Sequence, residues 1–333
     1  MAMIRDMMPT FDLFQPGSVG DAVALLDRYG SDAWTMGGGL DTFEWLKERI
    51  RRPAVVVDLG SISELRGVRT TDDGIEIGAM TTLTEVIADD AVTTGFGLLA
   101  TAAGVVATPQ IRNQGTLGGN LAQDARCWYY RGGWPCYRAD GNICYADTPT
   151  SINREHALFG ADRCVAVSPS DTAPALVALD AKMVINSTSG ERLVDAEDFF
   201  IGPGADITRM TVLEPSDLLT SIRIPATWAG ARFYFEKARD RQAWDFPLVN
   251  IASAMEVSDG VIQRARVVVN AVSCVPMRLT NVEEQIRGER VSEELAEAAG
   301  EVAVQGARPL VHNRYKIPLM KNLVKRAIRD AQA

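Results

Sequence analysis

Two glycine-rich segments constrain this chain more than any other feature of its sequence. Residues 37–41, GGGLD, follow a short run that is expected to form a strand, and residues 110–120, QIRNQGTLGGN, contain three more glycines. Glycine lets the backbone approach a ligand closely, and successive backbone N–H groups can surround a phosphate. Either segment alone is compatible with an ordinary tight turn. Two such segments together favour a site that holds the two phosphates of a dinucleotide.

The hydrophobic pattern predicts an α+β protein. In the first part, helices are expected at 18–30 and 42–52 and strands at 34–36 and 54–59. The middle part is expected to contain a hairpin at 66–79, helices at 82–88, 97–107 and 172–179, an irregular loop at 109–120, and strands at 182–185 and 217–224. Strands at 233–238, 248–257 and 261–272, followed by helices at 282–286, 292–306 and 314–329, indicate a separate C-terminal α+β domain.

Composition excludes several classes of protein. With 47% hydrophobic and 23% charged residues, the chain is neither disordered nor a coiled coil. The net charge is −9 and no basic block offsets it, so a nucleic-acid partner is not expected. No apolar run reaches the roughly 18–20 residues of a membrane span. The first 18 residues contain Asp6 and Asp12 and no long apolar run, so we expect no signal peptide and a cytoplasmic protein.

Four of the five cysteines fall in one segment, at Cys127, Cys136, Cys144 and Cys164. In a reducing compartment, clustered thiols hold a metal more often than they form disulfides. Their spacing, with 8, 7 and 19 intervening residues, is not the CxxC pattern of a zinc site. The segment is rich in Trp and Tyr and lacks periodicity, which indicates a long ordered insert. The fifth cysteine, Cys274, is expected to be a packed core thiol.

The second glycine segment resembles the FAD-binding medium subunit of the molybdenum hydroxylases. That family includes carbon monoxide dehydrogenase, xanthine dehydrogenase, 4-hydroxybenzoyl-CoA reductase and bacterial aldehyde oxidoreductases. Further matches follow in order at residues 37–41, 168–175, 217–219, 237–247, 260–278 and 316–327. The resemblance implies a p-cresol-methylhydroxylase-type FAD-binding fold over residues 1–226, with α/β subdomains at about 1–60 and 61–226. A Cys-rich insert at 124–167 and a small α+β domain at 227–333 complete the expected organisation.

The resemblance also implies non-covalent FAD. No His or Cys stands where a covalent flavin link would be needed, and the two histidines, His156 and His312, are not expected to be catalytic. The implied cofactor-binding residues lie in both glycine segments and at three later positions. They are Gly37, Gly38, Gly39, Leu40, Asp41, Thr116, Leu117, Gly118, Gly119, Asn120, Asp171, Leu219 and Lys237.

The cysteine segment resembles an insert found in 4-hydroxybenzoyl-CoA reductase and in certain aldehyde oxidoreductase subunits, which carries a [4Fe–4S] cluster. The implied ligands are Cys127, Cys136, Cys144 and Cys164, since four thiolates suffice for such a cluster. Two alternatives remain open: a structural zinc ion held by the same thiolates, and thiols without a ligand.

The sequence offers no acid–base pair or nucleophile that would process an organic substrate, so no catalytic residue is assigned. By resemblance, the chain is expected to be the electron-transfer subunit of a heterotrimer. A molybdopterin-binding large subunit would hold the substrate, a small subunit would hold two [2Fe–2S] clusters, and an external acceptor would exchange electrons with FAD. The alternatives are a stand-alone FAD-dependent oxidase or dehydrogenase with its own substrate, and a non-catalytic flavin-binding assembly factor.

Overall fold

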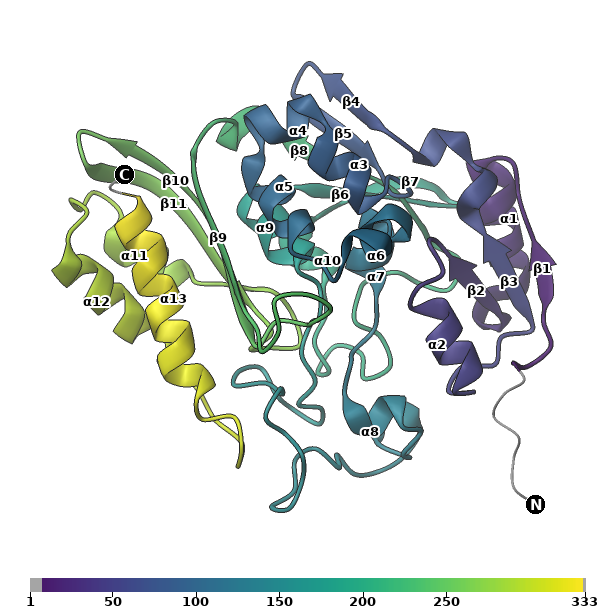
Figure 1. Cartoon of the computed structure of the whole chain (residues 1–333). Helices are drawn as coiled ribbons and strands as arrows, with labels where there is room; N and C mark the ends of the chain where they lie inside the picture. Colours follow the sequence, from purple (N-terminus) through teal and green to yellow (C-terminus); the bar gives the residue numbers. More distant parts are fainter. Residues whose placement is uncertain (1–7, 332–333) are drawn as a thin grey trace.

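The computed structural model describes residues 8–331, which form three sheets with helices packed on them (Figure 1). The first sheet is parallel, with the strand order β1 (Asp12–Phe14), β3 (Val55–Asp58), β2 (Ala33–Met36). Its central strand, β3, contains the three buried valines that the β-branched run predicted. Helix α1 (Val19–Tyr29) begins after Ser18, whose Oγ accepts a hydrogen bond from the N–H of Asp21.

The second sheet is antiparallel and has five strands. Their order is β4 (Val68–Thr71), β5 (Gly74–Gly78), β8 (Leu218–Pro225), β6 (Lys182–Ser187), β7 (Gly190–Asp195). The helices that contribute to the core on this sheet include α3 (Leu83–Ala88), α4 (Asp90–Gly95), α5 (Gly97–Gly104) and α9 (Thr172–Ala178). Buried side chains such as Ile77, Leu99 and Leu176 join the sheet and these helices in one hydrophobic cluster.

The third sheet belongs to the C-terminal part of the chain. Its antiparallel strands are ordered β12 (Met277–Arg278), β11 (Val261–Asn270), β10 (Val249–Ser258), β9 (Arg232–Ala238). Helices α11 (Thr280–Ile286), α12 (Glu293–Ala303) and α13 (Lys316–Asp330) share a core with it. Along β10, Ile251 belongs to that core, whereas Ala252 and Ala254 belong to the core of the second sheet. Both faces of this sheet are therefore covered, and the two larger sheets pack through α5 and α9.

The Cys-rich insert contains little regular structure, as its lack of periodicity predicted. Between Cys127 and Cys164 the structure has one short helix, α8 (Trp128–Arg131), and a 3-10 turn (Tyr137–Ala139). The loops of the insert lie beneath the three sheets in the view of Figure 1. The C-terminal domain contacts the C-terminal part of the insert. The side-chain amide of Asn313 donates hydrogen bonds to the carbonyls of His156 and Ala157.

The α+β prediction is confirmed, and three local predictions need correction. Residues 109–120 were expected to be irregular but form α6 (Pro109–Gln114) and α7 (Leu117–Ala122). Thr108 and Thr116 cap these helices by accepting hydrogen bonds from the N–H groups of Ile111 and Gly119. Helix α2 (Thr42–Lys47) ends earlier than predicted, with Arg49 in the left-handed region at φ 56°. Strands β1 and β7 and helices α4 and α10 (Ala196–Phe199) were not predicted.

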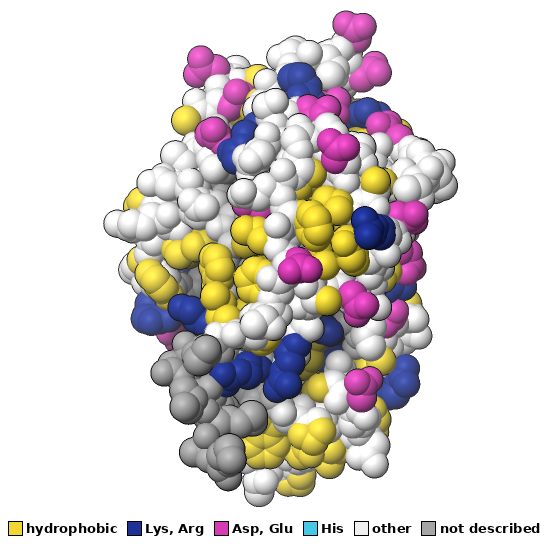
Figure 2. Space-filling view, turned by 90° about the vertical axis from the view of Figure 1, so that its right-hand side faces the viewer, with side chains coloured by type: hydrophobic (Ala, Val, Ile, Leu, Met, Phe, Trp, Pro, Cys, Tyr) yellow, Lys and Arg dark blue, Asp and Glu magenta, His cyan; other side chains and the backbone are white. Residues whose placement is uncertain are grey.

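Within residues 8–331 no helix combines the length and the apolar character that a membrane crossing requires. The signal-peptide prediction concerns residues 1–18, of which residues 1–7 lie outside the described part of the chain. On the face shown in Figure 2, Lys and Arg side chains gather in the lower half, and Asp and Glu are spread along the rest of that face. Hydrophobic side chains are exposed between them, so this face mixes charges of both signs with apolar area.

Candidate functional site

A cavity of about 450 Å³ lies between the two glycine segments. One wall is the segment 37–41, which connects β2 to α2. Another wall is formed by Thr116, Gly119 and Asn120 at the start of α7, and residues 244–246 of the C-terminal domain close a third side. The cavity therefore collects residues from three separate parts of the chain, as a large cofactor requires.

The glycines bring the two segments into direct contact. A Cβ atom added at Gly38 would lie 2.0 Å from the carbonyl oxygen of Gln114, and one added at Gly118 would lie 2.8 Å from the Cβ of Ala79. Gly39 has φ +78°, which favours glycine. Close packing of backbone on backbone thus explains why these positions are glycine, in addition to any space that a ligand needs.

The first segment has free hydrogen-bond donors. In residues 8–331 the backbone N–H groups of residues 38–41 form no hydrogen bond. The second segment differs, because Leu117 and Gly118 donate to the carbonyls of Thr81 and Ala79, and Gly119 donates to Thr116 Oγ1. An anionic group in this cavity would therefore find its backbone donors mainly in the first segment.

We expect Gly38→Ala to lower the affinity for FAD, because the added methyl group forces the two segments apart at the cavity wall. The loss should be about tenfold or greater, since backbone must move to remove a 2.0 Å contact. FAD titration of the apoprotein, followed by flavin fluorescence, measures it. Gly95→Ala is the matched control, because a Cβ there meets nothing within 4 Å. Unchanged affinity in the Gly38 variant would contradict this account of the site.

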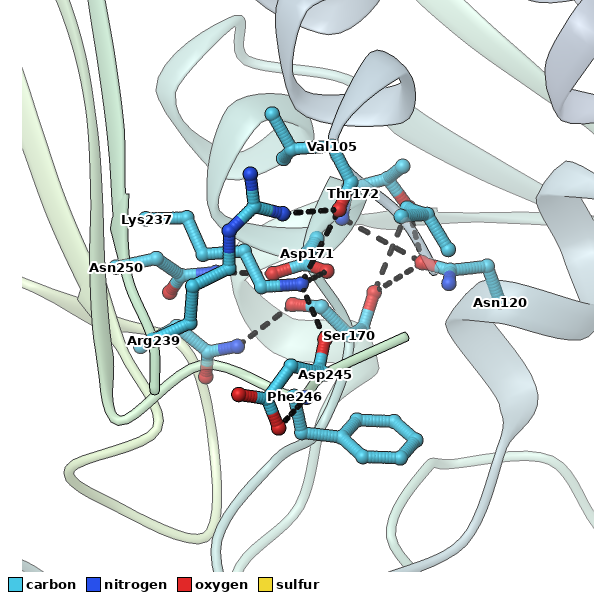
Figure 3. A network of polar contacts seen from close by, with 12 residues as sticks. Val105, Asn120, Ser170, Asp171, Thr172, Lys237, Arg239, Asp245, Phe246 and Asn250 are labelled. Atoms are coloured by element: carbon cyan, nitrogen blue, oxygen red, sulfur yellow. Dashed lines mark hydrogen bonds and ion pairs between the residues drawn. The ribbon is translucent and has the colours of Figure 1, made fainter. Parts of the chain in front are cut away.

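A buried ion pair forms the floor of the site (Figure 3). Lys237 Nζ donates to Asp171 Oδ2 at 2.6 Å, and the side-chain amide of Asn250 donates to Asp171 Oδ1 at 2.9 Å. The side chains of Lys237 and Asp171 are 1% and 4% exposed. Burial raises the pKa of Asp171, while Lys237 and Asn250 act in the opposite direction. The same ammonium donates to the carbonyls of Val105 and Asp245, so it joins four segments of the chain.

Asn120 connects the second glycine segment to this floor. Its Oδ1 accepts hydrogen bonds from the hydroxyls of Ser170 and Thr172, both at 2.7 Å (Figure 3). Because Ser170 and Thr172 flank Asp171, the ion pair and the wall of the cavity are fixed relative to each other.

We expect Lys237→Met to destabilise the protein by about 3–5 kcal/mol, because it leaves the Asp171 carboxylate buried without its cation. Urea unfolding of the apoprotein measures the change in the free energy of unfolding. Lys182→Met is the control: Lys182 pairs with Asp195 at the surface, where an ion pair contributes about 0–1 kcal/mol. A Lys237 variant within about 1 kcal/mol of the wild-type free energy would show that the pair is not a structural requirement.

The predicted cofactor-binding residues divide into two groups in the structure. Leu117, Gly118, Leu219 and Lys237 are not at the cavity surface; the first three are buried, and the Lys237 side chain lies behind Asp171. The other predicted positions line the cavity: residues 37–41, Thr116, Gly119, Asn120 and Asp171. Their direct contacts with FAD stay predictions.

Several residues at the cavity were not predicted as cofactor-binding, among them Arg126, Trp244 and Phe246. Trp244 and Phe246 are 62% and 42% exposed, and the Arg126 guanidinium lies 4.5 Å from the centre of the Phe246 ring. Exposed aromatic side chains beside a cavity indicate a ligand-binding site. Their position at this cavity depends on how the C-terminal domain packs, which the sequence pattern does not reveal.

The thiols of the insert approach one another around Cys127. Burial raises the pKa of Cys127 to about 11, with smaller contributions from the neighbouring Cys164 and Cys144. Cys127 packs against a small cluster containing Cys164 and against another containing Cys136. The fifth cysteine is buried, as predicted, but it also lies beside the insert: Cys274 donates to the carbonyl of Ala166 at 2.8 Å and lowers the pKa of Cys164.

In the described part of the chain, no group of three or more His, Cys, Asp or Glu side chains is arranged to hold a metal ion. The surroundings nevertheless suit an anionic group. The side chain of Arg138 is 2% exposed, and its Nε and Nη1 have no hydrogen-bond acceptor among residues 8–331. This guanidinium lies beside Cys164, whose pKa it lowers, and its nearest carboxylate, Asp124, is 3.6 Å away.

Comparison with known proteins identifies the class. Residues 9–227 match the family model of the FAD binding domain in molybdopterin dehydrogenase, and residues 233–331 match the CO dehydrogenase flavoprotein C-terminal domain. The fold is therefore that of a flavoprotein oxidoreductase subunit. The chain belongs to the family of FAD-binding medium subunits of carbon monoxide dehydrogenase and related molybdenum hydroxylases.

Individual relatives agree with this assignment. The chain is 30% identical to the carbon monoxide dehydrogenase medium chain of Hydrogenophaga pseudoflava, covering 98% of both chains. It is also 30% identical to the aldehyde oxidoreductase FAD-binding subunit PaoB of Escherichia coli K12, covering 90% of this chain and 91% of PaoB. The structure of the Hydrogenophaga enzyme superposes with a TM-score of 0.77 at 29% identity over 98% of both chains. Quinoline 2-oxidoreductase of Pseudomonas putida 86 gives 0.76 at 25% identity, with the same coverage.

Proposed function

We propose that this chain is the electron-transfer subunit of a heterotrimeric molybdenum hydroxylase in the cytoplasm. It passes electrons between a [2Fe–2S] small subunit and an external acceptor, and a molybdopterin-binding large subunit holds the substrate. The observation that carries the proposal is the cavity of about 450 Å³ with the free N–H groups of residues 38–41 on its wall. Bound FAD supplies the capacity to accept and release electrons.

Each residue group has a proposed part in holding FAD. The N–H groups of residues 38–41 bind the pyrophosphate, and the side chains of Thr116 and Asn120 lie across the cavity from them. Asp171, fixed by Lys237, offers its carboxylate at the floor. Leu219 and the buried glycines do not contact FAD but support the cavity wall by packing beneath it.

The carboxylates at the cavity favour electron transfer over substrate chemistry. Asp171 is bound by Lys237 and Asn250, and Asp245 accepts hydrogen bonds from the N–H groups of Asp240 and Arg241. Two further acidic side chains, Asp41 and Glu44, are paired with arginines. A general base must be able to reach the proton that it removes, and these carboxylates are already held by other groups of the protein. A stand-alone oxidase or dehydrogenase is therefore the less supported alternative.

We expect the chain to co-purify with a large and a small subunit when all three are co-expressed, and heat denaturation of that complex to release FAD into solution. The release follows because no residue is expected to bond covalently to the flavin. Size-exclusion chromatography and analysis of the supernatant test both points. A monomer that oxidises an organic substrate alone, or flavin retained on the denatured chain, would contradict the proposal.

We further propose that the insert binds a [4Fe–4S] cluster through Cys127, Cys136, Cys144 and Cys164. The support is the gathering of thiols around Cys127 and the buried charge of Arg138 beside Cys164, which an anionic cluster would offset. The residues Arg126 and Arg131 join this insert to the wall of the flavin cavity, so a redox centre there would be a neighbour of FAD.

We expect anaerobically purified protein to contain about four iron and four sulfide per chain, and Cys144→Ser to lose most of both. FAD should stay bound in this variant, because Cys144 does not line the flavin cavity. Metal analysis, sulfide assay and the visible spectrum measure these quantities. Ile152→Ala is the control, because this side chain is also in the insert and is 67% exposed. One zinc and no iron, or no metal at all, would overturn the cluster and leave a flavoprotein with a structural insert.

A further inference from the structure

Asp41 stands at the end of the first glycine segment, but its carboxylate faces the insert. Arg131 Nη1 donates to Asp41 Oδ1 at 2.8 Å, and Nη2 donates to Oδ2 at 3.3 Å. Trp45 Nε1 donates to the same Oδ2 at 3.1 Å, and Arg126 forms an ion pair with Oδ1 at 3.0 Å. Both carboxylate oxygens are thus occupied by groups of the protein.

Arg131 is bound on every side. Its guanidinium lies 3.7 Å from the centre of the Trp45 ring, and it also donates to Glu44 and to the carbonyls of Asp124 and Ala125. Its side chain is only 10% exposed, which makes this contact stronger than a surface ion pair. Arg131 does not line the flavin cavity, so any effect it has on FAD must pass through other residues.

The contact between Arg131 and Asp41 restrains the glycine-rich segment 37–41. Three consecutive glycines have wide conformational freedom, and ordering them when FAD binds would cost free energy. A segment that is already fixed in the free protein binds more tightly, because that cost is not incurred on binding. Asp41 and helix α2 are the fixed end of the segment, and the insert fixes them.

We propose that the Cys-rich insert is an intramolecular clamp on the flavin site, with Arg131 as the positioning residue that holds Asp41 and thereby preorganises residues 37–41 for FAD. This inference rests on FAD binding at the proposed cavity and is independent of any metal in the insert. The sequence suggested that Asp41 contacts FAD directly. In this proposal the Asp41 side chain instead binds Arg131 and affects FAD binding indirectly.

FAD titration of the full-length apoprotein tests the clamp. Arg131→Met should bind FAD about fivefold to tenfold more weakly. Arg131→Lys should recover only part of the loss, because lysine keeps the charge but cannot bind both carboxylate oxygens in one plane. Arg163→Met is the control: Arg163 is also in the insert, is half-exposed, and contacts its neighbour Asp162 and the carbonyl of Pro203, outside the glycine segments. Its FAD affinity should equal that of the wild type.

A double-mutant cycle separates positioning from direct contact. If Asp41 acts through Arg131, Asp41→Asn should weaken FAD binding in the wild-type protein and much less in the Arg131→Met background. Equal losses in both backgrounds, or wild-type affinity in a folded Arg131→Met protein, would overturn the clamp. Circular dichroism and thermal unfolding establish that each variant is folded. Absence of FAD binding by the wild-type protein would instead overturn the proposed function itself.

Discussion

The proposed flavin site depends on one buried ion pair, that of Lys237 with Asp171. Lys237 belongs to β9 of the C-terminal sheet, and Asp171 lies at the end of the loop that leads from the insert to α9. Burying two charges costs more free energy than their attraction returns unless further hydrogen bonds satisfy them. Here Asn250, Val105 and Asp245 supply those bonds. The pair therefore links the C-terminal sheet to the loop before α9 through fully bonded charges.

The walls of the cavity follow from that arrangement. The lysine holds the carbonyl of Asp245, which places the adjacent Trp244 and Phe246 at the cavity. Asn120 binds the hydroxyls on both sides of Asp171, which fixes the start of α7 against the floor. Glycine at position 38 then lets the first segment lie directly against Gln114. The cavity is formed by segments far apart in the sequence, and the buried polar contacts of Lys237 and Asn120 hold these segments together.

Many helices and strands, and the two glycine segments, can be predicted from the sequence because they depend on local residue patterns. The valines of β3, the glycine segments and the strands of the C-terminal domain were recognised because their patterns depend on neighbours in sequence. Helices α6 and α7 are not evident from the sequence, although Thr108 and Thr116 stand at capping positions, because three glycines in this segment are typical of a loop. The partner of Asp41 could not have been predicted, since Arg131 is 90 positions away and only folding brings the two together.

The guanidinium of Arg138 in the insert is buried with part of its hydrogen-bonding capacity unused. Arg138 is buried in the insert, shares Asp124 with Arg51, and has two nitrogen atoms without a hydrogen-bond acceptor among the described residues. Leaving a guanidinium in this state costs several kcal/mol, and an apolar side chain of similar size would avoid the cost. Additional negative charge beside Arg138 would offset this cost. Thiolates that hold an iron–sulfur group would bring that charge to Cys164, whereas neutral thiols would leave the cost in place.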